Sequence, residues 1–215
     1  MTMPFSVLVT KPMAHCRPVG FTEYLQNADF SVGPDAPRCH HCGKALGMLP
    51  WLPPYVVDLE TWGREFGDFV AGPHTDLLIS EHAREVIERE TLTGLTGFDA
   101  VEIRRVRKHA RFSGSVPRYY RVSVIRSNAL IDQAASGVEW STPPTCPICQ
   151  MGAGLKRIRR IIIRRDSWSG EGIFLVKPLP ATVFVSGRFR EVCESERLTN
   201  MLFIAATSYS YESGP

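Results

Sequence analysis

The segment Ser80-Glu-His-Ala-Arg-Glu-Val-Ile-Glu-Arg-Glu-Thr-Leu-Thr93 is matched 106 positions later by Ser186-Gly-Arg-Phe-Arg-Glu-Val-Cys-Glu-Ser-Glu-Arg-Leu-Thr199, with eight of 14 residues identical. Self-similarity at a fixed spacing is typical of repeated structural units. Each segment follows a short apolar run and begins with a serine, a residue that caps helix N-termini well. The apolar residues inside each segment recur at helical spacing. The sequence therefore predicts a strand followed by a helix, and predicts this unit twice.

The spacing extends beyond these two segments. Trp62 and Trp168 are also 106 residues apart, and Cys39-His-His-Cys42 precedes Cys146-Pro-Ile-Cys149 by 107. Because this offset is about half of the 215 residues, we infer two related halves. We expect each half to contain one CxxC pair, one main helix and one tryptophan that anchors its core. The predicted domains are residues 1–110 and residues 111–215.

This order of elements predicts an α+β fold. Strand, helix and strand in succession suit helices packed on a sheet. We expect two similar halves from a tandem duplication, each with a mostly antiparallel or mixed sheet, joined by a pair of zinc knuckles. The expected strands are Phe5–Val9, Tyr55–Leu59, Thr75–Ile79, Phe98–Ile103, Tyr119–Ile125, Arg160–Ile163, Ile173–Val176, Thr182–Val185 and Met201–Ala206.

The composition is that of an ordinary globular protein, with 44% apolar and 22% charged residues. The longest apolar run, Met201–Ala206, is far shorter than the roughly 20 residues that span a membrane. The N-terminus does not have the pattern of a secretory signal. We therefore expect a cytoplasmic protein, in which the six cysteines are thiols or metal ligands rather than disulfides.

The two CxxC pairs are the strongest chemical signal in the chain. The two-residue gap lets one tight turn direct both sulfurs at a single ion, and zinc prefers four such ligands in a tetrahedron. We expect Cys39, Cys42, Cys146 and Cys149 to bind one structural zinc ion where the two halves meet. A redox pair, or thiols without any metal, are the alternatives. Neither pair directly precedes an apolar-periodic helix, as a thioredoxin-like redox motif would.

The remaining candidate ligands are weaker. Cys193 takes the place of Ile87 in the repeat, so we expect it to pack in the core. Cys16 has no counterpart in the second half. His40 and His41 correspond to Pro147 and Ile148, so the shared geometry does not need them. Whether Cys16, His40 or His41 takes part in metal binding is left open.

Positive charge is concentrated in the middle of the chain. Residues 100–165 contain 14 Lys/Arg and 3 Asp/Glu, although the net charge of the whole chain is only +3. Arginines beside zinc knuckles suit phosphate contacts, so a zinc-dependent nucleic-acid-binding or regulatory module is one candidate function. An acidic partner protein, or acidic segments of this chain, would account for the arginines equally well. Gly-x-Ser-x-Gly and His-Glu-x-x-His are absent, and no catalytic constellation is predicted.

Paired CxxC(G) motifs about a hundred residues apart resemble the double-CxxCG-motif proteins that occur as paralogues in myxobacteria. The resemblance rests on Cys39-His-His-Cys-Gly43, on Cys146-Pro-Ile-Cys-Gln150, which lacks the motif's glycine, and on Val183-Phe-Val-Ser-Gly-Arg-Phe-Arg-Glu-Val192. It covers the chain from about residue 35 onward. Members of that family are assigned as immunity proteins, so the resemblance implies a non-catalytic protein that binds and neutralises one toxin in the cytosol. For a toxin with a basic cleft, we expect the Glu-rich helix Glu81–Glu90 to be a better contact face than the basic middle.

Overall fold

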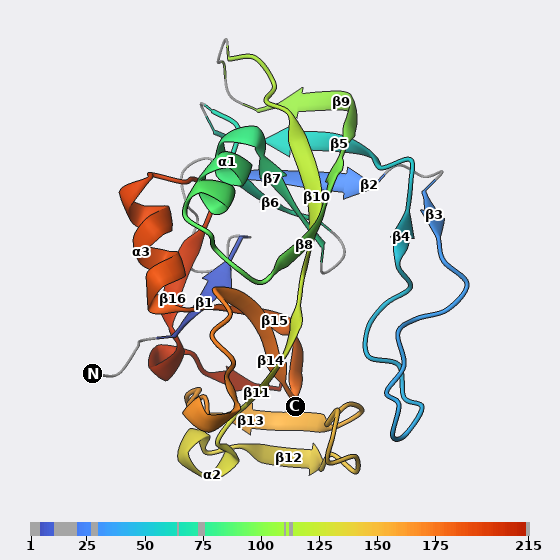
Figure 1. Ribbon diagram of the computed structural model, residues 1–215, viewed down its shortest axis with the longest axis vertical. Coiled ribbons are helices and arrows are strands. Elements are labelled where there is room, and N and C mark those ends of the chain that lie inside the picture. Colours follow the sequence, from blue (N-terminus) through green and yellow to red (C-terminus); the bar gives the residue numbers. More distant parts are fainter. Residues whose placement is uncertain are drawn as a thin grey trace.

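The computed structural model describes residues 5–10, 21–26, 30–63, 65–72, 76–109, 111 and 114–213. Its largest element is a seven-stranded mixed sheet, shown in the upper part of Figure 1. In spatial order its strands are β8 (Leu95–Ala100), β10 (Tyr119–Val124), β7 (Asp76–Ser80), β6 (Phe69–Ala71), β2 (Thr22–Gln26), β5 (Val56–Thr61) and β9 (Glu102–Lys108).

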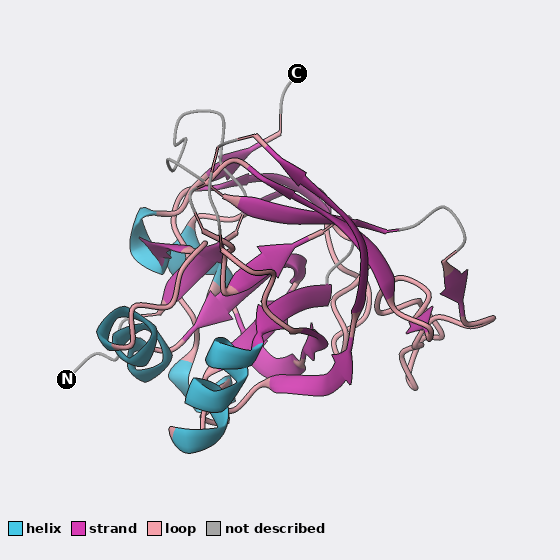
Figure 2. Ribbon diagram, turned by 90° about the horizontal axis from the view of Figure 1, so that it is seen from above, coloured by secondary structure: helices cyan, strands magenta, loops and turns pink. Residues whose placement is uncertain are grey.

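A second, five-stranded sheet has a matching strand order. Its strands are β11 (Arg126–Leu130), β14 (Ile173–Lys177), β15 (Leu179–Val185), β1 (Ser6–Val9) and β16 (Leu202–Ala205). Two smaller sheets complete the fold, and Figure 2 shows how strongly the main strands curve. The smaller sheets contain β12 (Glu139–Thr142), β13 (Gly154–Ile158) and β17 (Tyr211–Glu212), and β3 (Ser31–Val32) with β4 (Trp51–Leu52).

The two main helices have the same length and the same local geometry. Helix α1 (Glu81–Arg89) and helix α3 (Gly187–Ser195) lie side by side in Figure 1, and α2 (Gln133–Ser136) is a single short turn. Two 3₁₀ turns follow elsewhere, at Arg165–Ser167 and Ala206–Ser208. As predicted, Ser80 caps α1 by accepting a hydrogen bond from the Ala83 N–H, and Ser186 caps α3 through the Phe189 N–H.

The strands next to these helices are arranged alike. β7, α1 and β8 correspond to β15, α3 and β16, and a further antiparallel strand separates the two strands of each set. In the first sheet that strand is β10, and in the second it is β1, from the start of the chain. Sheet membership therefore does not follow a division at residue 110, because β1 completes the second sheet and β10 completes the first.

One apolar core joins the two sheets. Leu77 and Ile79 of β7 point into it, as does Val185 of β15, with Val183 packed partly buried against it. Leu78, between Leu77 and Ile79, faces a separate cluster on the outer side of the first sheet. Phe184, between Val183 and Val185, faces another cluster on the outer side of the second sheet. This alternation follows from the period of two along a strand. The central core thus receives side chains from both halves and from both helices.

Two threonines tie the halves together reciprocally. The backbone carbonyl of Thr93 accepts hydrogen bonds from the N–H groups of Gly172 and Ile173, each at 3.0 Å. Thr199, which is equivalent to Thr93, accepts from the Phe69 N–H through its carbonyl at 3.3 Å. It also accepts from the Asp68 N–H through its hydroxyl, at 3.1 Å. Each half therefore supplies hydrogen-bond acceptors for the start of a strand in the other half.

Two of the expected strands are wrong. Arg160–Ile163 forms no strand; Ile163 makes an isolated bridge with Ile131, while the Ile161 N–H donates to Ala206. Ile161 and Ile163 are buried, but the hydrogen-bond partners of this segment include Ser136 of α2 and Ala206 of a 3₁₀ turn rather than a neighbouring strand. The expected strand Phe98–Ile103 is divided between β8 and β9, which lie at opposite edges of the sheet. Phe98 has a φ of 57°, which interrupts a regular strand there.

The two tryptophans have different surroundings. Trp168 packs against the cluster beneath the second sheet, with its ring centroid 5.1 Å from that of Phe5. Trp62 is half-buried and stacks between the rings of Phe21, at 4.5 Å, and His109, at 4.7 Å. The expectation of a core anchor therefore fits Trp168 but not Trp62, which forms an aromatic stack outside the main clusters.

Candidate metal centre

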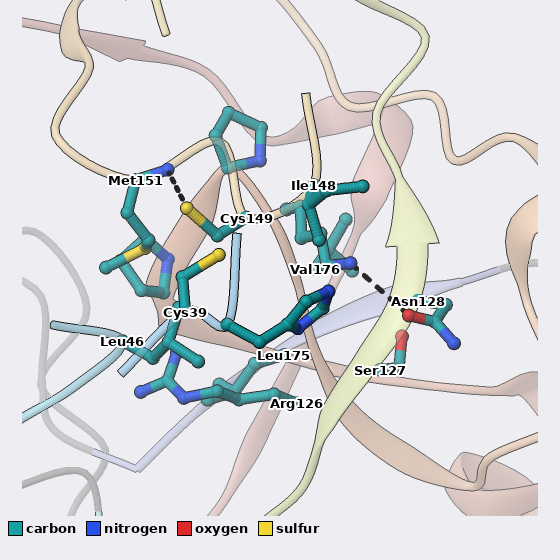
Figure 3. A pocket seen from close by; sticks show the side chains of 14 residues that line it. Cys39, Leu46, Arg126, Ser127, Asn128, Ile148, Cys149, Met151, Leu175 and Val176 are labelled. Atoms are coloured by element: carbon teal, nitrogen blue, oxygen red, sulfur yellow. Dashed lines mark hydrogen bonds between the residues drawn. The ribbon is translucent and has the colours of Figure 1, made fainter. Parts of the chain in front are cut away.

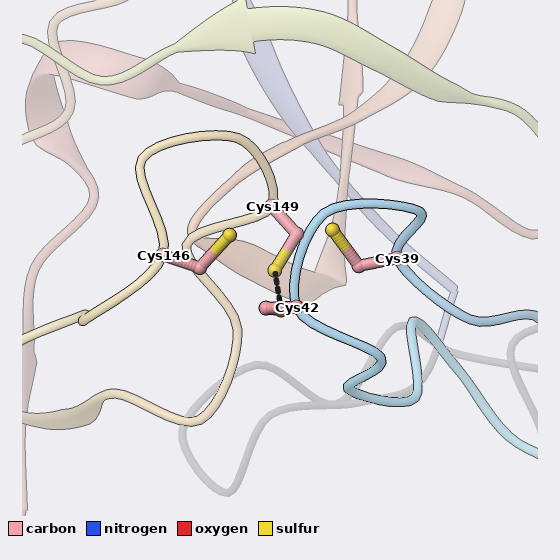
Figure 4. A group of neighbouring side chains, drawn as sticks. All are labelled: Cys39, Cys42, Cys146 and Cys149. Atoms are coloured by element: carbon pink, nitrogen blue, oxygen red, sulfur yellow. Dashed lines mark hydrogen bonds between the residues drawn. The ribbon is translucent and has the colours of Figure 1, made fainter.

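The structure brings together the four cysteines of the two CxxC pairs. Their sulfur atoms all lie within 4.8 Å of one another, and the Cys42 and Cys149 sulfurs are 3.6 Å apart. Figure 4 shows one loop from each half meeting at this point. In a tetrahedral zinc site with Zn–S bonds of about 2.3 Å, neighbouring sulfurs are about 3.8 Å apart. The four side chains are therefore close enough to hold a metal ion.

The two loops have similar turns. The Gly43 N–H donates to the Cys39 carbonyl at 2.8 Å, and the Gln150 N–H donates to the Cys146 carbonyl at 3.1 Å. The residue after each second cysteine has a left-handed backbone, with φ of 72° at Gly43 and 55° at Gln150. This conformation suits glycine and strains a residue with a side chain. The second turn therefore keeps the shape of the first despite the missing glycine.

We expect Gln150→Gly to stabilise the protein. The substitution removes the left-handed strain, for a gain of about 0.5–1 kcal/mol in the free energy of unfolding. Gly43→Ala is the matched control. A Cβ at Gly43 would meet no atom within 4 Å, so its cost arises from the backbone alone. Urea denaturation measures both changes, and equal stability of all three proteins would contradict this account of the turns.

A lysine connects the two loops. Lys44 of the first loop donates from Nζ to the Thr145 hydroxyl at 3.0 Å and to the Met151 carbonyl at 3.3 Å. Leu46 and Met151 pack against the buried cysteines from either side. Sequence reasoning did not identify Lys44, because its partners are more than a hundred residues away and no local pattern marks such a contact.

The thiol pKa values diverge within the cluster. A hydrogen bond from the Cys149 backbone N–H is the main cause that lowers the pKa of Cys146 to about 6. The backbone N–H groups of Cys42 and His41 lower the pKa of Cys39. For Cys42, the Lys44 backbone N–H favours the thiolate, but burial and the other three sulfurs raise its pKa to about 12. Four adjacent thiolates repel one another, so their full ionisation requires a cation among them.

The structure describes three of the four other candidate ligands. Among the described residues, the metal-capable group at this point consists of the four cysteines and includes neither His40 nor His41. Cys16 lies outside the described residues. Cys193 is 1% exposed in the central core, where burial raises the pKa of its thiol to about 12.

We expect Cys193→Val to have a small effect, because it exchanges one small buried apolar side chain for another. The free energy of unfolding should change by less than about 1.5 kcal/mol, and the metal content should not change. Thermal unfolding together with metal analysis checks both points. Loss of metal from this variant would contradict the alignment of the two halves.

Many arginines of the basic middle are paired within the chain. Arg104 and Arg107 reach Asp58 and Glu60 across neighbouring strands, each at 3.3 Å. Further pairs of this kind are Arg121 with Asp76 and Asp99, Arg157 with Glu139, and Arg164 with Asp166. Acidic residues of the chain itself therefore account for much of the positive charge that the sequence concentrates there.

A cavity of about 220 Å³ adjoins the cysteine cluster (Figure 3). Cys39 and Cys149 form part of its wall, and strands β11 and β14 form the opposite side. Most of its lining is apolar, as is usual for pockets that bind small molecules or side chains. Among the helices that the structure describes, none has the length and apolar character needed to cross a bilayer.

Comparison with known proteins identifies the family. A model described as "Immunity protein family (Imm11)" matches residues 11–208, and no curated protein matches the chain. The predicted membership of an immunity protein family is thereby confirmed, although the description does not refer to the paired cysteine motif. Since the match covers most of the 215 residues, the chain belongs to the Imm11 immunity protein family.

Proposed function

We propose that this chain binds and neutralises a cognate bacterial toxin in the cytosol, without catalysis, on a scaffold held by one zinc ion. The family match over residues 11–208 carries the proposal, since an immunity protein implies a toxin partner in general. Blocking a toxin requires a rigid surface of complementary shape and no reacting group.

The zinc ion is proposed from the donor set. Four clustered soft sulfur ligands favour zinc over oxygen-preferring cations such as Mg²⁺ and Ca²⁺. The proposed ligands are Cys39, Cys42, Cys146 and Cys149, whose sulfurs lie within 4.8 Å of one another. Binding would fix the position of the 30–52 loop against the second half, and so reduce the ordering cost when a partner binds.

Co-expression tests the proposed function. The gene for this chain and a candidate toxin gene from its genomic neighbourhood would be placed under separate promoters in one bacterial strain. We expect growth to be restored by this chain and not by an unrelated family member, because immunity depends on a specific complex. Growth arrest that persists with abundant, folded protein would contradict the proposal.

A nucleic-acid-binding function is less well supported. Phosphate contacts need cationic side chains that are available to the ligand, whereas Arg104, Arg121 and Arg157 each pair with carboxylates of this chain. A complex with DNA or RNA would lose orders of magnitude in affinity as salt rises. We expect no such salt-dependent binding in a fluorescence titration with duplex DNA or single-stranded RNA.

We also propose that the halves 1–110 and 111–215 arose by tandem duplication, with one strand exchanged. The matching caps of α1 and α3, the equivalent strand orders and the reciprocal roles of Thr93 and Thr199 support this. The exchange places β1, from the start of the chain, where β10 stands in the first sheet. The metal centre would then join two copies of one ancestral loop.

A further inference from the structure

Two cavities lie where the loop that carries β3 and β4 meets the rest of the protein. The cavity beside the cysteines has a volume of about 220 Å³, and the second has about 180 Å³. Arg126 and Leu175 line both of them. We call the two cavities together the Arg126 groove. Its walls come from residues 32–51, from the second cysteine loop, and from strands β7, β10, β11 and β14.

The first cavity is largely apolar, and apart from the cysteines of the proposed metal centre its charged lining residues are cationic. Among the described residues that line it, Arg126 and Lys177 carry positive charge, and none is acidic. Lys177 donates from Nζ to the Asn128 side chain at 3.3 Å and forms no ion pair with a carboxylate of a described residue. The apolar lining residues are Leu46, Ile148, Met151, Leu175, Val176, Pro178 and Pro180. This lining complements an aliphatic group that carries a negative charge.

Arg126 differs from the neighbouring arginine. Arg121, which lines the second cavity, pairs with Asp76 at 3.1 Å and with Asp99 at 3.3 Å. No described residue forms a hydrogen bond or an ion pair with the Arg126 guanidinium, whose pKa is lowered by its partial desolvation. The Arg126 side chain is exposed, so its several fixed donors are open to a ligand in the groove.

Exposed apolar side chains surround the groove. Val32, Met48 and Leu49 line the second cavity and are 39%, 55% and 43% exposed, and Ile148 of the first cavity is 42% exposed. The Nε1 atom of Trp51, which also lines the second cavity, is buried without a hydrogen-bond partner. Apolar surface around a few polar groups is typical of a protein-binding site.

We propose that the Arg126 groove binds a segment of the toxin that places a carboxylate on Arg126 and an aliphatic side chain in the first cavity. The carboxylate can accept two parallel hydrogen bonds from the guanidinium, which fixes its orientation. The proposal rests on the proposed function for the identity of the partner, but the chemistry of the groove can be tested without it.

Another role for Arg126 must be separated from this one. Cys39 and Cys149 line the same cavity, so the guanidinium could instead balance the negative charge of a thiolate centre. In that case, loss of Arg126 would weaken metal binding and would leave the binding of a carboxylate probe unchanged. Measuring zinc affinity and carboxylate-probe binding on an Arg126 variant therefore distinguishes the two roles.

The probes are N-acetyl-L-leucine, which has a free carboxylate, and its amide, which has the same side chain without the charge. Each is titrated into the metal-loaded, ¹⁵N-labelled full chain and followed by amide chemical shifts. We expect the carboxylate probe to shift residues 126–128 and 175–177, with the millimolar dissociation constant of a ligand of about 12 non-hydrogen atoms. The amide probe should bind about 10-fold more weakly, because it lacks the charge-assisted hydrogen bonds.

Arg126→Gln should reduce binding of the carboxylate probe about 10-fold and leave the zinc affinity, measured by chelator competition, unchanged. Arg118→Gln is the matched control, since the Arg118 side chain is 80% exposed and its partner is Glu81. This control should bind the probe like the wild type. If Arg126→Gln does not fold, the difference in affinity between the carboxylate and amide probes for the wild-type protein still tests the proposal.

Equal binding of the two probes, no binding of either, or a weakened zinc affinity with unchanged probe binding would overturn the proposal. If neither probe binds but the chain neutralises its toxin, the groove is rejected as the binding site and the proposed function is retained. Probe binding without any toxin neutralisation would support the groove chemistry and reject the toxin as its occupant.

Discussion

Replacing Cys39 by serine is expected to remove the bound metal and to lower the melting temperature by about 10 °C or more. The variant would retain three sulfurs, and a serine hydroxyl is a poor substitute for a thiolate ligand of zinc. Cys39 comes from the first half and two of the remaining ligands from the second, so its loss releases the contact between the loops. In a protein of this size about 1 kcal/mol corresponds to roughly 2–4 °C, so this decrease represents several kcal/mol.

Cys146→Ser should give the same result from the opposite half, because both loops hold one ion. Differential scanning fluorimetry and metal analysis on the same samples measure the two effects together. Cys193→Val is the control for a change of cysteine outside the cluster. If Cys39→Ser lost its metal and Cys146→Ser kept it, the two loops would not share a site.

Asp68→Ala is expected to cost about 3 kcal/mol or more in the free energy of unfolding. The Asp68 carboxylate accepts hydrogen bonds from the Ser80 hydroxyl and, at 2.8 and 2.9 Å, from the N–H and hydroxyl of Thr199. Ser80 caps α1 and Thr199 belongs to the other half. The Asp68 side chain therefore supports both the helix cap and the contact between the two halves. Each buried donor left without an acceptor costs about 1–3 kcal/mol.

Asp166→Ala is the matched control for this prediction. Asp166 too accepts hydrogen bonds, in its case from Arg164, but its side chain is 68% exposed. Exposed ion pairs contribute little to stability. Urea denaturation should therefore separate Asp68→Ala clearly from both Asp166→Ala and the wild type. Equal stability of the two variants would mean that the Asp68 contacts do not hold the halves together.

The sequence predicts the helices well, because their determinants are local. The serine caps and the apolar spacing of α1 and α3 lie within the repeated segments themselves. Strands β2, β6, β11 and β13 were not identified, since each is three to five residues long and lacks a distinct alternation. The place of β1 beside β15 and β16 depends on pairing across nearly the whole chain, which no local pattern specifies.

The candidate site likewise has features that the sequence predicts and features that it does not. The turn of a CxxC pair is local, and the common spacing of the two pairs predicted that all four sulfurs would meet. The unpaired state of Arg126 could not be predicted, because it depends on which carboxylates the fold brings near each arginine. Arg121 and Arg126 are five positions apart in one basic segment, yet only Arg121 meets Asp76 and Asp99.

The most direct test of this account is the metal content of the purified, reduced protein, measured by native mass spectrometry. We predict one zinc ion per chain. Acid, which protonates the four thiolates, or a strong chelator should release the ion, and its release should greatly lower the thermal stability. A folded, reduced protein without bound metal, and with the same melting temperature before and after chelation, would contradict the claim that four cysteines from the two halves share one ion.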